Sequence, residues 1–152
     1  MPNTDAKLEI MELFSGYLLC CDERNFNSEL FASIFTSDAI VKMPFMRESK
    51  SVKDTQKLHA SFFSQFKTTH HVSTDYVFFF SSDIEAEVRC KVSSFYDLLG
   101  SHMKAGQGSN FLTATAMFSV VHSGNCWHIR RLKVDIKNLY SLSVADKTKD
   151  IF

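Results

Sequence analysis

Two adjacent histidines, His70 and His71, are the side chains of this sequence best suited to proton transfer near neutral pH. An imidazole has an unperturbed pKa of about 6.5, so it accepts and releases a proton under ordinary conditions. The pair stands in the run FKTTHHVSTDYVFFF, whose β-branched and aromatic residues predict a strand. Because neighbouring side chains of a strand point to opposite faces, one of the two faces the interior and the other faces outward.

The pattern of the strand leaves open which histidine is inside. His70 shares its face with the more apolar set, which includes Val72, Tyr76 and Phe78, and this favours His70. A register slip at a bulge would reverse the assignment and turn His71 inward. Neither residue is assigned to chemistry by this pattern alone.

Two further candidates stand near the end of the first predicted helix. A carboxylate that pairs with a histidine fixes its tautomer and raises its basicity, and Asp22 is the natural carboxylate. The hydroxyl of Tyr17 could polarise a substrate carbonyl as an oxyanion-hole donor, or it could be a core hydroxyl with a protein partner. On an ideal helix Tyr17 and Asp22 lie about 140° apart, so both reach one cavity only if the helix ends or distorts near Cys21.

The elements that must position these residues are helices in the first half of the chain. Capping residues in NTD predict a first amphipathic helix that runs to about Asp22. Asn27 and Ser28 predict a second short helix, which carries Leu30 to Phe35. The run TSDAIVKMP reads as a turn and a short strand, and SVKDTQKLHASFFSQF reads as a third helix opened by Ser51.

From residue 68 onward the sequence predicts strands. Four long extended runs, separated by short polar breaks or a loop, are Thr68–Phe80, Ile84–Leu99, Asn110–His122 and Cys126–Leu139. SSD and SGN have the residues of hairpin turns, and GSHMKAGQGSN reads as a longer loop. Strands this long exceed the usual length of about 5–6 residues and must twist and coil, so the sheet should be strongly curved.

Helices followed by a curved, mainly antiparallel sheet predict an α+β fold, a cone whose concave face packs on the helices and closes around a pocket. The 15 phenylalanines suit such a pocket, and Phe14, Phe62 and Phe78 are the expected lining residues. Arg130 and Arg131 interrupt the alternation of the last strand. A bulge there would send one of them to the pocket mouth, with Arg131 as the candidate, and the alternative is that both lie on a solvated edge. The convex face needs cover, which predicts a homodimer through the sheet.

The bulk composition bounds the class of protein. A chain of 152 residues is one domain, expected to have a core over about 5–140 and a partly ordered tail over 141–152. The 17 basic and 17 acidic residues show no basic cluster, which argues against a nucleic-acid partner. We see neither a membrane-length apolar run nor a signal peptide, and the four cysteines show no paired spacing. We therefore expect a cytoplasmic protein with reduced thiols.

Motifs for metals and cofactors give no match. The remaining histidines are His59, His102, His122 and His128, and they stand on different predicted elements without metal-ligand spacing. The sequence has no P-loop and no dinucleotide-binding glycine motif. We expect no structural metal and no cofactor.

Four runs, taken in order, resemble the SnoaL-like, or nuclear-transport-factor-like, superfamily: YLLCCDERNF, LFASIFTSDAIVKMP, TTHHVSTDYVFF and CWHIRRLKV. The resemblance covers about Asp5 to Tyr140. It implies a cone-shaped, cystatin-like fold. The superfamily includes ketosteroid isomerases, scytalone dehydratase, bile-acid dehydratases and polyketide cyclases, so the fold alone does not assign the chemistry.

The resemblance also implies roles for single residues. Tyr17 matches a catalytic tyrosine of the isomerases and bile-acid dehydratases, Asp22 matches a dehydratase aspartate at the helix end, and the histidine pair matches a pocket histidine, best aligned with His71. Met43 replaces the catalytic aspartate of the isomerases, which argues against ketosteroid isomerisation. The second histidine or aspartate of the dehydratases has no clear counterpart, with Ser94 near its position and Asp97 three residues on.

Two functions follow as expectations. The first is a cofactor-free lyase or isomerase, dehydratase- or cyclase-like, that acts on a small apolar molecule by His/Asp acid–base chemistry. Its residues would be His71 or His70 for proton transfer, Asp22 as orienting group or second base, and Tyr17 as the donor to a carbonyl. The second is a ligand-binding or accessory-subunit protein of the same fold that performs no catalysis.

Overall fold

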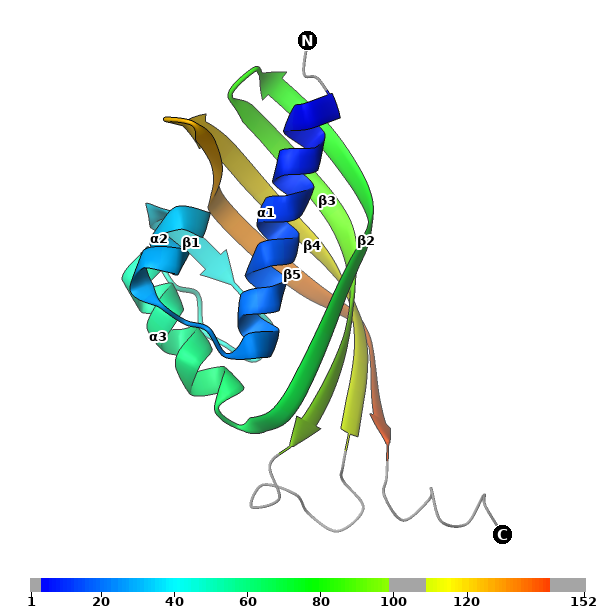
Figure 1. Cartoon of the computed structure of the whole chain (residues 1–152). Helices are drawn as coiled ribbons and strands as arrows, with labels where there is room; N and C mark the ends of the chain where they lie inside the picture. The colour runs from blue at the N-terminus through cyan, green and yellow to red at the C-terminus, as the bar shows by residue number, and fades with distance from the viewer. Residues whose placement is uncertain (1–3, 99–108, 143–152) are drawn as a thin grey trace, which may run out of the picture.

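The computed structural model describes residues 4–98 and 109–142. These residues form an α+β fold, as the sequence predicts (Figure 1). Its elements, in chain order, are α1 (Thr4–Glu23), α2 (Ser28–Ile34), β1 (Phe35–Lys42), α3 (Val52–Phe63), β2 (Phe66–Ser82), β3 (Glu85–Leu98), β4 (Ser109–Ser123) and β5 (Cys126–Leu142). The expected tail lies almost wholly outside the described residues, and so does most of the expected loop over 100–110.

Five strands make one sheet in the order β1-β5-β4-β3-β2. All neighbours are antiparallel except β1, which pairs parallel with β5. The sheet twists strongly along its length, and α1 lies across its concave face while α2 and α3 flank β1 (Figure 1). This curvature is what strands of 14 to 17 residues require.

The helix ends follow local signals in the sequence. The Asn27 side chain accepts hydrogen bonds from the backbone N–H groups of Glu29 and Leu30, and Ser51 accepts one from Asp54, so both expected caps are in place. Two expected bounds need correction. Phe35 begins β1 instead of ending α2, because the chain turns extended there at φ −110°, and α3 ends at Phe63, with Phe66 already in β2.

A β-bulge in β2 resolves the orientation of the histidine pair. Asp75 has a φ of 57°, and the register passes from Thr74 opposite Lys91 to Val77 opposite Arg89, so β2 carries one extra residue. Before the bulge the inward residues have odd numbers, and after it they have even numbers. His71 therefore shares the concave side with the aromatic residues Tyr76, Phe78 and Phe80, while His70 is exposed.

The core lies between α1 and the concave face of the sheet. Phe14 of α1 is fully buried and stacks on Phe118 of β4, with ring centroids 4.6 Å apart. Phe31, Phe35 and Phe63 complete an aromatic cluster where α2, β1 and α3 meet. Much of the phenylalanine content thus forms a packed interior.

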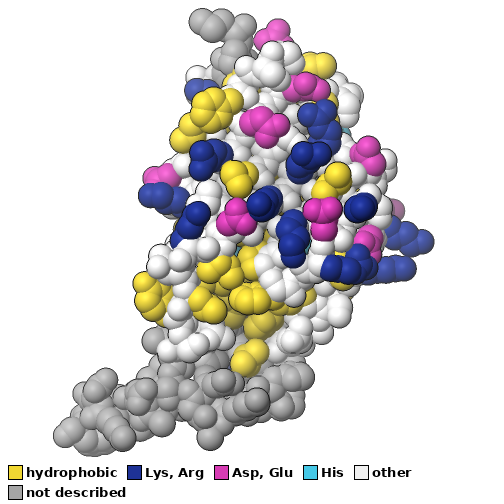
Figure 2. Space-filling model, turned by 180° about the vertical axis from the view of Figure 1, so that it is seen from behind, with side chains coloured by type: hydrophobic (Ala, Val, Ile, Leu, Met, Phe, Trp, Pro, Cys, Tyr) yellow, Lys and Arg dark blue, Asp and Glu magenta, His cyan; other side chains and the backbone are white. Residues whose placement is uncertain are grey.

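The outer face of the sheet has two parts. Figure 2 shows charged side chains of both signs over one part and hydrophobic side chains gathered toward one end. Cross-strand pairing places His70, Phe95, Phe111 and Tyr140 in one outer row. Among the helices of the described ranges, none combines the length and apolar character that a membrane crossing needs.

Candidate active site

The carboxylate of Asp22 and the imidazole of His71 form a buried pair. Oδ1 of Asp22 lies 2.6 Å from Nδ1 of His71, and Oδ2 accepts a hydrogen bond of 2.9 Å from the His71 backbone N–H. The side chains are 15% and 3% exposed, respectively. Burial opposes ionisation of Asp22, but its hydrogen bonds with His71 and the attraction to that imidazole outweigh burial and lower the pKa of the carboxyl.

The end of α1 aims this carboxylate at β2. The helix closes with hydrogen bonds from the backbone N–H groups of Arg24 and Asn25 to the carbonyls of Cys21 and Cys20, and Arg24 takes a φ of 58°. Asp22 thus stands in the last turn of α1. Five residues along the helix separate it from Tyr17, so the two side chains point about 140° apart around the helix axis. Asp22 accordingly contacts His71 of β2, and Tyr17 contacts His59 of α3.

Arg24 links the end of α1 to β2 beside the Asp22–His71 pair. Its guanidinium donates to Thr69 Oγ1 at 2.9 Å and to the carbonyl of Cys21 at 2.8 Å, and it lies 5.5 Å from the ring centroid of Phe63. Thr69 in turn donates to Oδ1 of Asp22 at 3.0 Å. The carboxylate is therefore held by donors from β2 on two sides.

The hydrogen bonds determine the tautomer of His71. The carboxylate of Asp22 can only accept, so Nδ1 of the imidazole carries the proton and Nε2 of the neutral ring presents a lone pair. That lone pair faces the hydroxyl of Tyr96, 2.9 Å away, which is therefore the donor. Burial raises the pKa of Tyr96 well above its ordinary value, so this hydroxyl keeps its proton at neutral pH.

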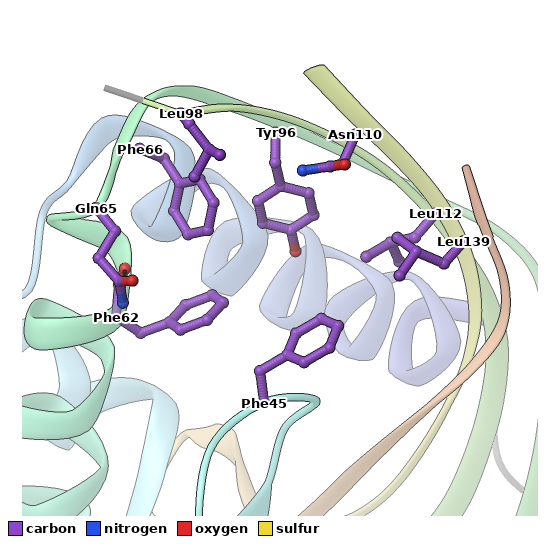
Figure 3. A pocket seen from close by; sticks show the side chains of 9 residues that line it. All are labelled: Phe45, Phe62, Gln65, Phe66, Tyr96, Leu98, Asn110, Leu112 and Leu139. Carbon is purple, nitrogen blue, oxygen red and sulfur yellow. Dashed lines mark hydrogen bonds between the residues drawn. The ribbon is translucent and has the colours of Figure 1, made fainter. Parts of the chain in front are cut away.

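Tyr96 separates His71 from the larger of two neighbouring cavities. This cavity has a volume of about 300 Å³, and its lining is mostly apolar and aromatic (Figure 3). The lining residues are Phe45, Phe62, Gln65, Phe66, Tyr96, Leu98, Asn110, Leu112 and Leu139. Figure 3 shows Phe45 and Phe62 on one side of the cavity, Leu112 and Leu139 on another, and Leu98 beside Phe66, with the Tyr96 hydroxyl directed into the space between them.

A smaller cavity of about 20 Å³ lies on the other side of Tyr96. Polar side chains of Tyr17, His71, Ser94 and Tyr96 contribute to its lining, with apolar side chains around them. Tyr96 and Leu112 line both cavities, so the two spaces adjoin at these residues. This volume is enough for about one water-sized group.

Tyr17 is engaged by a histidine that lies outside the pair. Its hydroxyl lies 2.5 Å from Nε2 of His59, whose Nδ1 lies 2.8 Å from the carbonyl oxygen of Thr55. A carbonyl can only accept, so Nδ1 carries the proton and Tyr17 donates to Nε2. Burial lowers the pKa of His59 to about 4, which keeps the ring neutral. This contact fits the alternative in which Tyr17 is a core hydroxyl with a protein partner, although the residue also lines the smaller cavity.

The expected pocket-lining residues fall in different places. Phe62 lines the larger cavity, and Phe14 borders the smaller one from within the core. Phe78 stacks between Tyr76 and Phe80, away from both cavities. The expected location of Arg131 needs correction: the bulge at Ser119/Val120 exists, but it leaves Arg131 exposed in a polar hollow of the outer face.

Sequence reasoning did not single out Tyr96 and assigned His59 no role. Tyr96 belongs to none of the expected motifs, and only its pairing opposite Thr69, beside His71, reveals it. His59 lies on the buried face of α3, one turn after Thr55, and this spacing was a usable signal of a local hydrogen bond. In the part of the chain that the structure describes, no three His, Cys, Asp or Glu side chains are grouped to hold a metal ion.

Comparison with known proteins extends this picture. A family model described as the SnoaL-like domain matches residues 2–133. A hexachlorocyclohexane dehydrochlorinase, LinA type 2, superposes with a TM-score of 0.80 at 18% identity, covering 92% of this chain and 90% of that one.

Two other solved structures are similar. A putative scytalone dehydratase from Novosphingobium aromaticivorans gives a TM-score of 0.77 at 20% identity, with 93% of each chain covered. A cystatin-like protein of unknown function from Nostoc punctiforme gives 0.71 at 19% identity, covering 90% of this chain and 94% of that one. Identities this low show the fold alone. No curated protein matches the chain.

Proposed function

We propose that this chain, which belongs to the SnoaL-like domain family and has its nuclear-transport-factor-like fold, is a cofactor-free lyase or isomerase acting on a small, mainly apolar molecule. The observation that carries the proposal is the buried Asp22–His71 pair, with its 2.6 Å contact and with Nε2 of His71 2.9 Å from the Tyr96 hydroxyl, which borders both cavities. The solved relatives include proteins described as a dehydrochlorinase and a putative dehydratase, both lyases, which agrees with this class.

His71 is the general base of the proposed reaction. A neutral imidazole whose Nδ1–H is held by a carboxylate has its Nε2 lone pair in a defined direction, and the carboxylate stabilises the imidazolium that forms on proton uptake. Asp22 contributes by orienting the ring through both the side chain and the backbone of residue 71. The proton abstracted from substrate would be one on a carbon next to an electron-withdrawing group.

Tyr96 is the proposed acid. Its hydroxyl donates to His71 when no substrate is bound, and a substrate oxygen that takes this donor would release the Nε2 lone pair for proton abstraction. Substrate binding would thereby activate the base. In the reaction, Nε2 of His71 would take the substrate proton and the Tyr96 hydroxyl would give its proton to the substrate. This leaves a protonated His71 next to a Tyr96 anion, 2.9 Å apart. Transfer of the proton from His71 to Tyr96 then restores both groups.

The larger cavity sets the expected size and character of the substrate. Its volume of about 300 Å³ is at the lower limit of the roughly 300–1,000 Å³ of ligand sites. The aromatic rings of Phe45, Phe62 and Phe66 suit a flat apolar skeleton, and the amides of Gln65 and Asn110 offer polar contacts. A small cyclic or aryl ketone fits this description.

Proton exchange in D₂O tests the proposal on simple ketones, whatever the natural substrate is. A panel of small cyclic and aryl ketones is incubated with the protein, and deuterium incorporation next to the carbonyl is followed by NMR. We expect catalysed exchange for at least one ketone, and we expect His71→Ala to lower its rate about a hundredfold or more while thermal-shift binding is retained.

The neighbouring residue provides the matched control. His70→Ala makes the same substitution one position away, on an exposed side chain of the opposite face, and should leave the exchange rate within about twofold. Equal rates for both variants and the wild-type protein would contradict the assignment of His71.

The second candidate function is ligand binding without catalysis. The observation that favours it is the Tyr96 hydroxyl, which already occupies the lone pair of His71 at 2.9 Å. A pair used only in packing would be satisfied in this way. In that case ligands would bind, and neither deuterium exchange nor elimination would exceed the uncatalysed rate for any member of the panel.

A further inference from the structure

Thr69 stands between a cation and the carboxylate of the site. Its hydroxyl oxygen accepts a hydrogen bond of 2.9 Å from the guanidinium of Arg24, and its hydroxyl donates one of 3.0 Å to Oδ1 of Asp22. The residue is 8% exposed. In the part of the chain that the structure describes, the other hydrogen-bond partners of this guanidinium are backbone carbonyls. The cation therefore reaches the carboxylate through the hydroxyl of Thr69.

The two partners fix the direction of the Thr69 hydroxyl. A guanidinium can only donate hydrogen bonds, and an ionised carboxylate can only accept them. The oxygen of Thr69 must accept from Arg24, so its single proton is given to Asp22. A β-branched side chain is also stiff about χ1, which holds the hydroxyl in place. A chain of donors with one fixed direction thus runs from Arg24 to the carboxylate.

Thr69 and His71 bind the same carboxylate oxygen. Oδ1 of Asp22 accepts from Nδ1 of His71 at 2.6 Å and from Thr69 at 3.0 Å. Burial opposes ionisation of Asp22, but the hydrogen bonds of His71 and Thr69 outweigh it and lower the pKa of the carboxyl. A donor that stabilises the anion makes the addition of a proton to the Asp22–His71 pair less favourable.

The strand itself does not require this hydroxyl. Valine has nearly the shape of threonine and the same preference for strands, and it has no polar group that burial must satisfy. The neighbouring Thr68 is exposed on the outer face, where its hydroxyl donates to Oδ2 of Asp97 at 2.9 Å. The two threonines therefore make similar hydrogen bonds, and that of Thr69 alone belongs to the site.

Ionisable groups of neighbouring elements surround the Asp22–His71 pair. They are Cys21 and Arg24 of α1, His59 of α3 and Tyr96 of β3. Burial raises the pKa of the Cys21 thiol and of the Tyr96 hydroxyl, and burial lowers the pKa of His59 to about 4. All three groups are therefore uncharged near neutral pH. The guanidinium of Arg24 is the charge that this set turns toward the pair.

We propose that Thr69 is a positioning residue that keeps the Asp22–His71 pair free to accept the substrate proton at mildly acidic pH, by giving Oδ1 the proton that Arg24 directs toward it. A proton taken up from solvent blocks the base, and the pair takes it up at a lower pH when its anion has this additional donor. The effect on rate rests on the function proposed above, whereas the effect on the titration of the pair does not.

The test compares variants that differ in one hydroxyl. Thr69→Val removes it at nearly constant shape, Thr69→Ser keeps it, and Thr69→Ala is a second variant without it in case valine prevents folding. Thr68→Val is the matched control, since it removes a hydrogen bond to a carboxylate one position away. NMR follows the carbon-bound ring protons of His71 without ligand from about pH 5.5 to about pH 9, and His71→Ala assigns them. The deuterium-exchange assay covers the same range.

For the titration, Thr69→Val should move the midpoint of the Asp22–His71 pair to higher pH, because the anion has lost a donor. Thr69→Ser and Thr68→Val should keep the midpoint of the wild-type protein. A midpoint that stays in place or moves to lower pH in Thr69→Val overturns the proposal. So does an equal movement in Thr68→Val.

For turnover, Thr69→Val should lower the exchange rate about tenfold at about pH 6 and less than about threefold at about pH 8.5, where the pair has lost the additional proton in both proteins. Thr69→Ser should stay within about threefold of the wild-type rate at both values. An equal loss at both pH values has a purely structural cause and overturns the proposal.

The two measurements separate this proposal from the proposed function. A midpoint that moves as expected, without exchange of any ketone, means that the role of Thr69 stands and the lyase fails. Exchange that His71→Ala abolishes, with a midpoint and a pH profile that Thr69→Val leaves unchanged, means that the lyase stands and the role of Thr69 fails.

Discussion

The carboxylate of Asp22 holds residue 71 by two groups at once, its imidazole Nδ1 at 2.6 Å and its backbone N–H at 2.9 Å. The two residues are 49 positions apart in the chain. One oxygen therefore fixes the ring and the other fixes the strand that carries it, so the end of α1 and the start of β2 form one rigid support for the base.

Asp22→Asn should disturb the orientation of the His71 ring without weakening ligand binding. An amide can present a donor to Nδ1 and stabilise the wrong tautomer of His71, so we expect the rate of ketone exchange or elimination to fall about a hundredfold or more. The ligand affinity should change less than about threefold, which calorimetry measures. Asp75→Asn is the matched control, because Asp75 is an exposed residue of β2 paired with Lys91. Equal activity of both variants would contradict the role of Asp22.

Tyr17 and Tyr96 should respond differently to loss of the hydroxyl. Tyr17 donates to His59, so Tyr17→Phe removes a buried hydrogen bond and should destabilise the protein by about 1–3 kcal/mol while turnover changes less than about threefold. Tyr96→Phe removes the proposed acid and should lower turnover about a hundredfold. Urea unfolding and the deuterium-exchange assay measure the two effects. A turnover loss in Tyr17→Phe as large as that in Tyr96→Phe would restore a direct role for Tyr17.

His59 should make the stability depend on pH. Burial lowers the pKa of His59 to about 4, against about 6.5 in the unfolded chain. Between these values the unfolded state binds more protons, so stability is complete above about pH 6.5 and is lost as the pH falls toward 4. The full difference corresponds to roughly 3 kcal/mol.

Urea midpoints at pH 7.5 and pH 5 check this prediction. His59→Gln should flatten the change over that window, and His70→Gln, which alters an exposed histidine, should not. The contribution of Asp22 does not interfere, because its lowered pKa places it in a window below about pH 4. A wild-type midpoint that stays constant from pH 7.5 to 5 would contradict the buried neutral state of His59.

Phe45 should lower the stability of the protein and strengthen ligand binding. It lines the larger cavity, is 67% exposed, and has a φ of 64°, a conformation that costs a bulky residue about 1–2 kcal/mol. Phe45→Gly should raise the free energy of unfolding by about 1 kcal/mol and weaken ketone binding several-fold. Phe45→Ala should weaken binding equally without the gain in stability, since its strain persists. Unchanged affinity in both variants would exclude Phe45 from the binding site.

We expect the chain to form a homodimer through the outer face of the sheet. The contact should centre on the outer row of His70, Phe95, Phe111 and Tyr140, where Phe95 is 49% and Tyr140 is 53% exposed. Phe95→Glu should convert dimer to monomer in sedimentation velocity. Val77→Glu places the same charge on a residue of this face that is 51% exposed, outside the row, and should leave the dimer intact. A wild-type monomer at high concentration would contradict this expectation.

The helix caps and the long strands were predictable because they depend on neighbours in the chain. Asn27 and Ser51 bond to backbone groups two or three residues away, so their sequence context contains the whole interaction. Strand periodicity likewise predicted β2 to β5 to within a few residues. The order of these elements, with the four family-like runs, was enough to identify the family.

The site was only partly predictable. Asp22 and a histidine of the pair were candidates by residue type and family position, but parity along β2 favoured the wrong face for His70. The bulge at Asp75 reverses that parity, and its positive φ follows from how β2 pairs with β3 over their whole length. Tyr96 and His59 gained their roles from partners 25 and 42 residues away.

By itself, then, the sequence determined the elements, their order and the residue types available for proton transfer, since these depend on local hydrogen bonds and on periodicity. The tertiary structure alone decided that His71 faces inward, that Asp22 meets it, and that the hydroxyl of Tyr17 meets His59. The physical reason is that each of these contacts joins groups whose distance is set by the sheet register and by the docking of α1, and neither is encoded in any short run of residues.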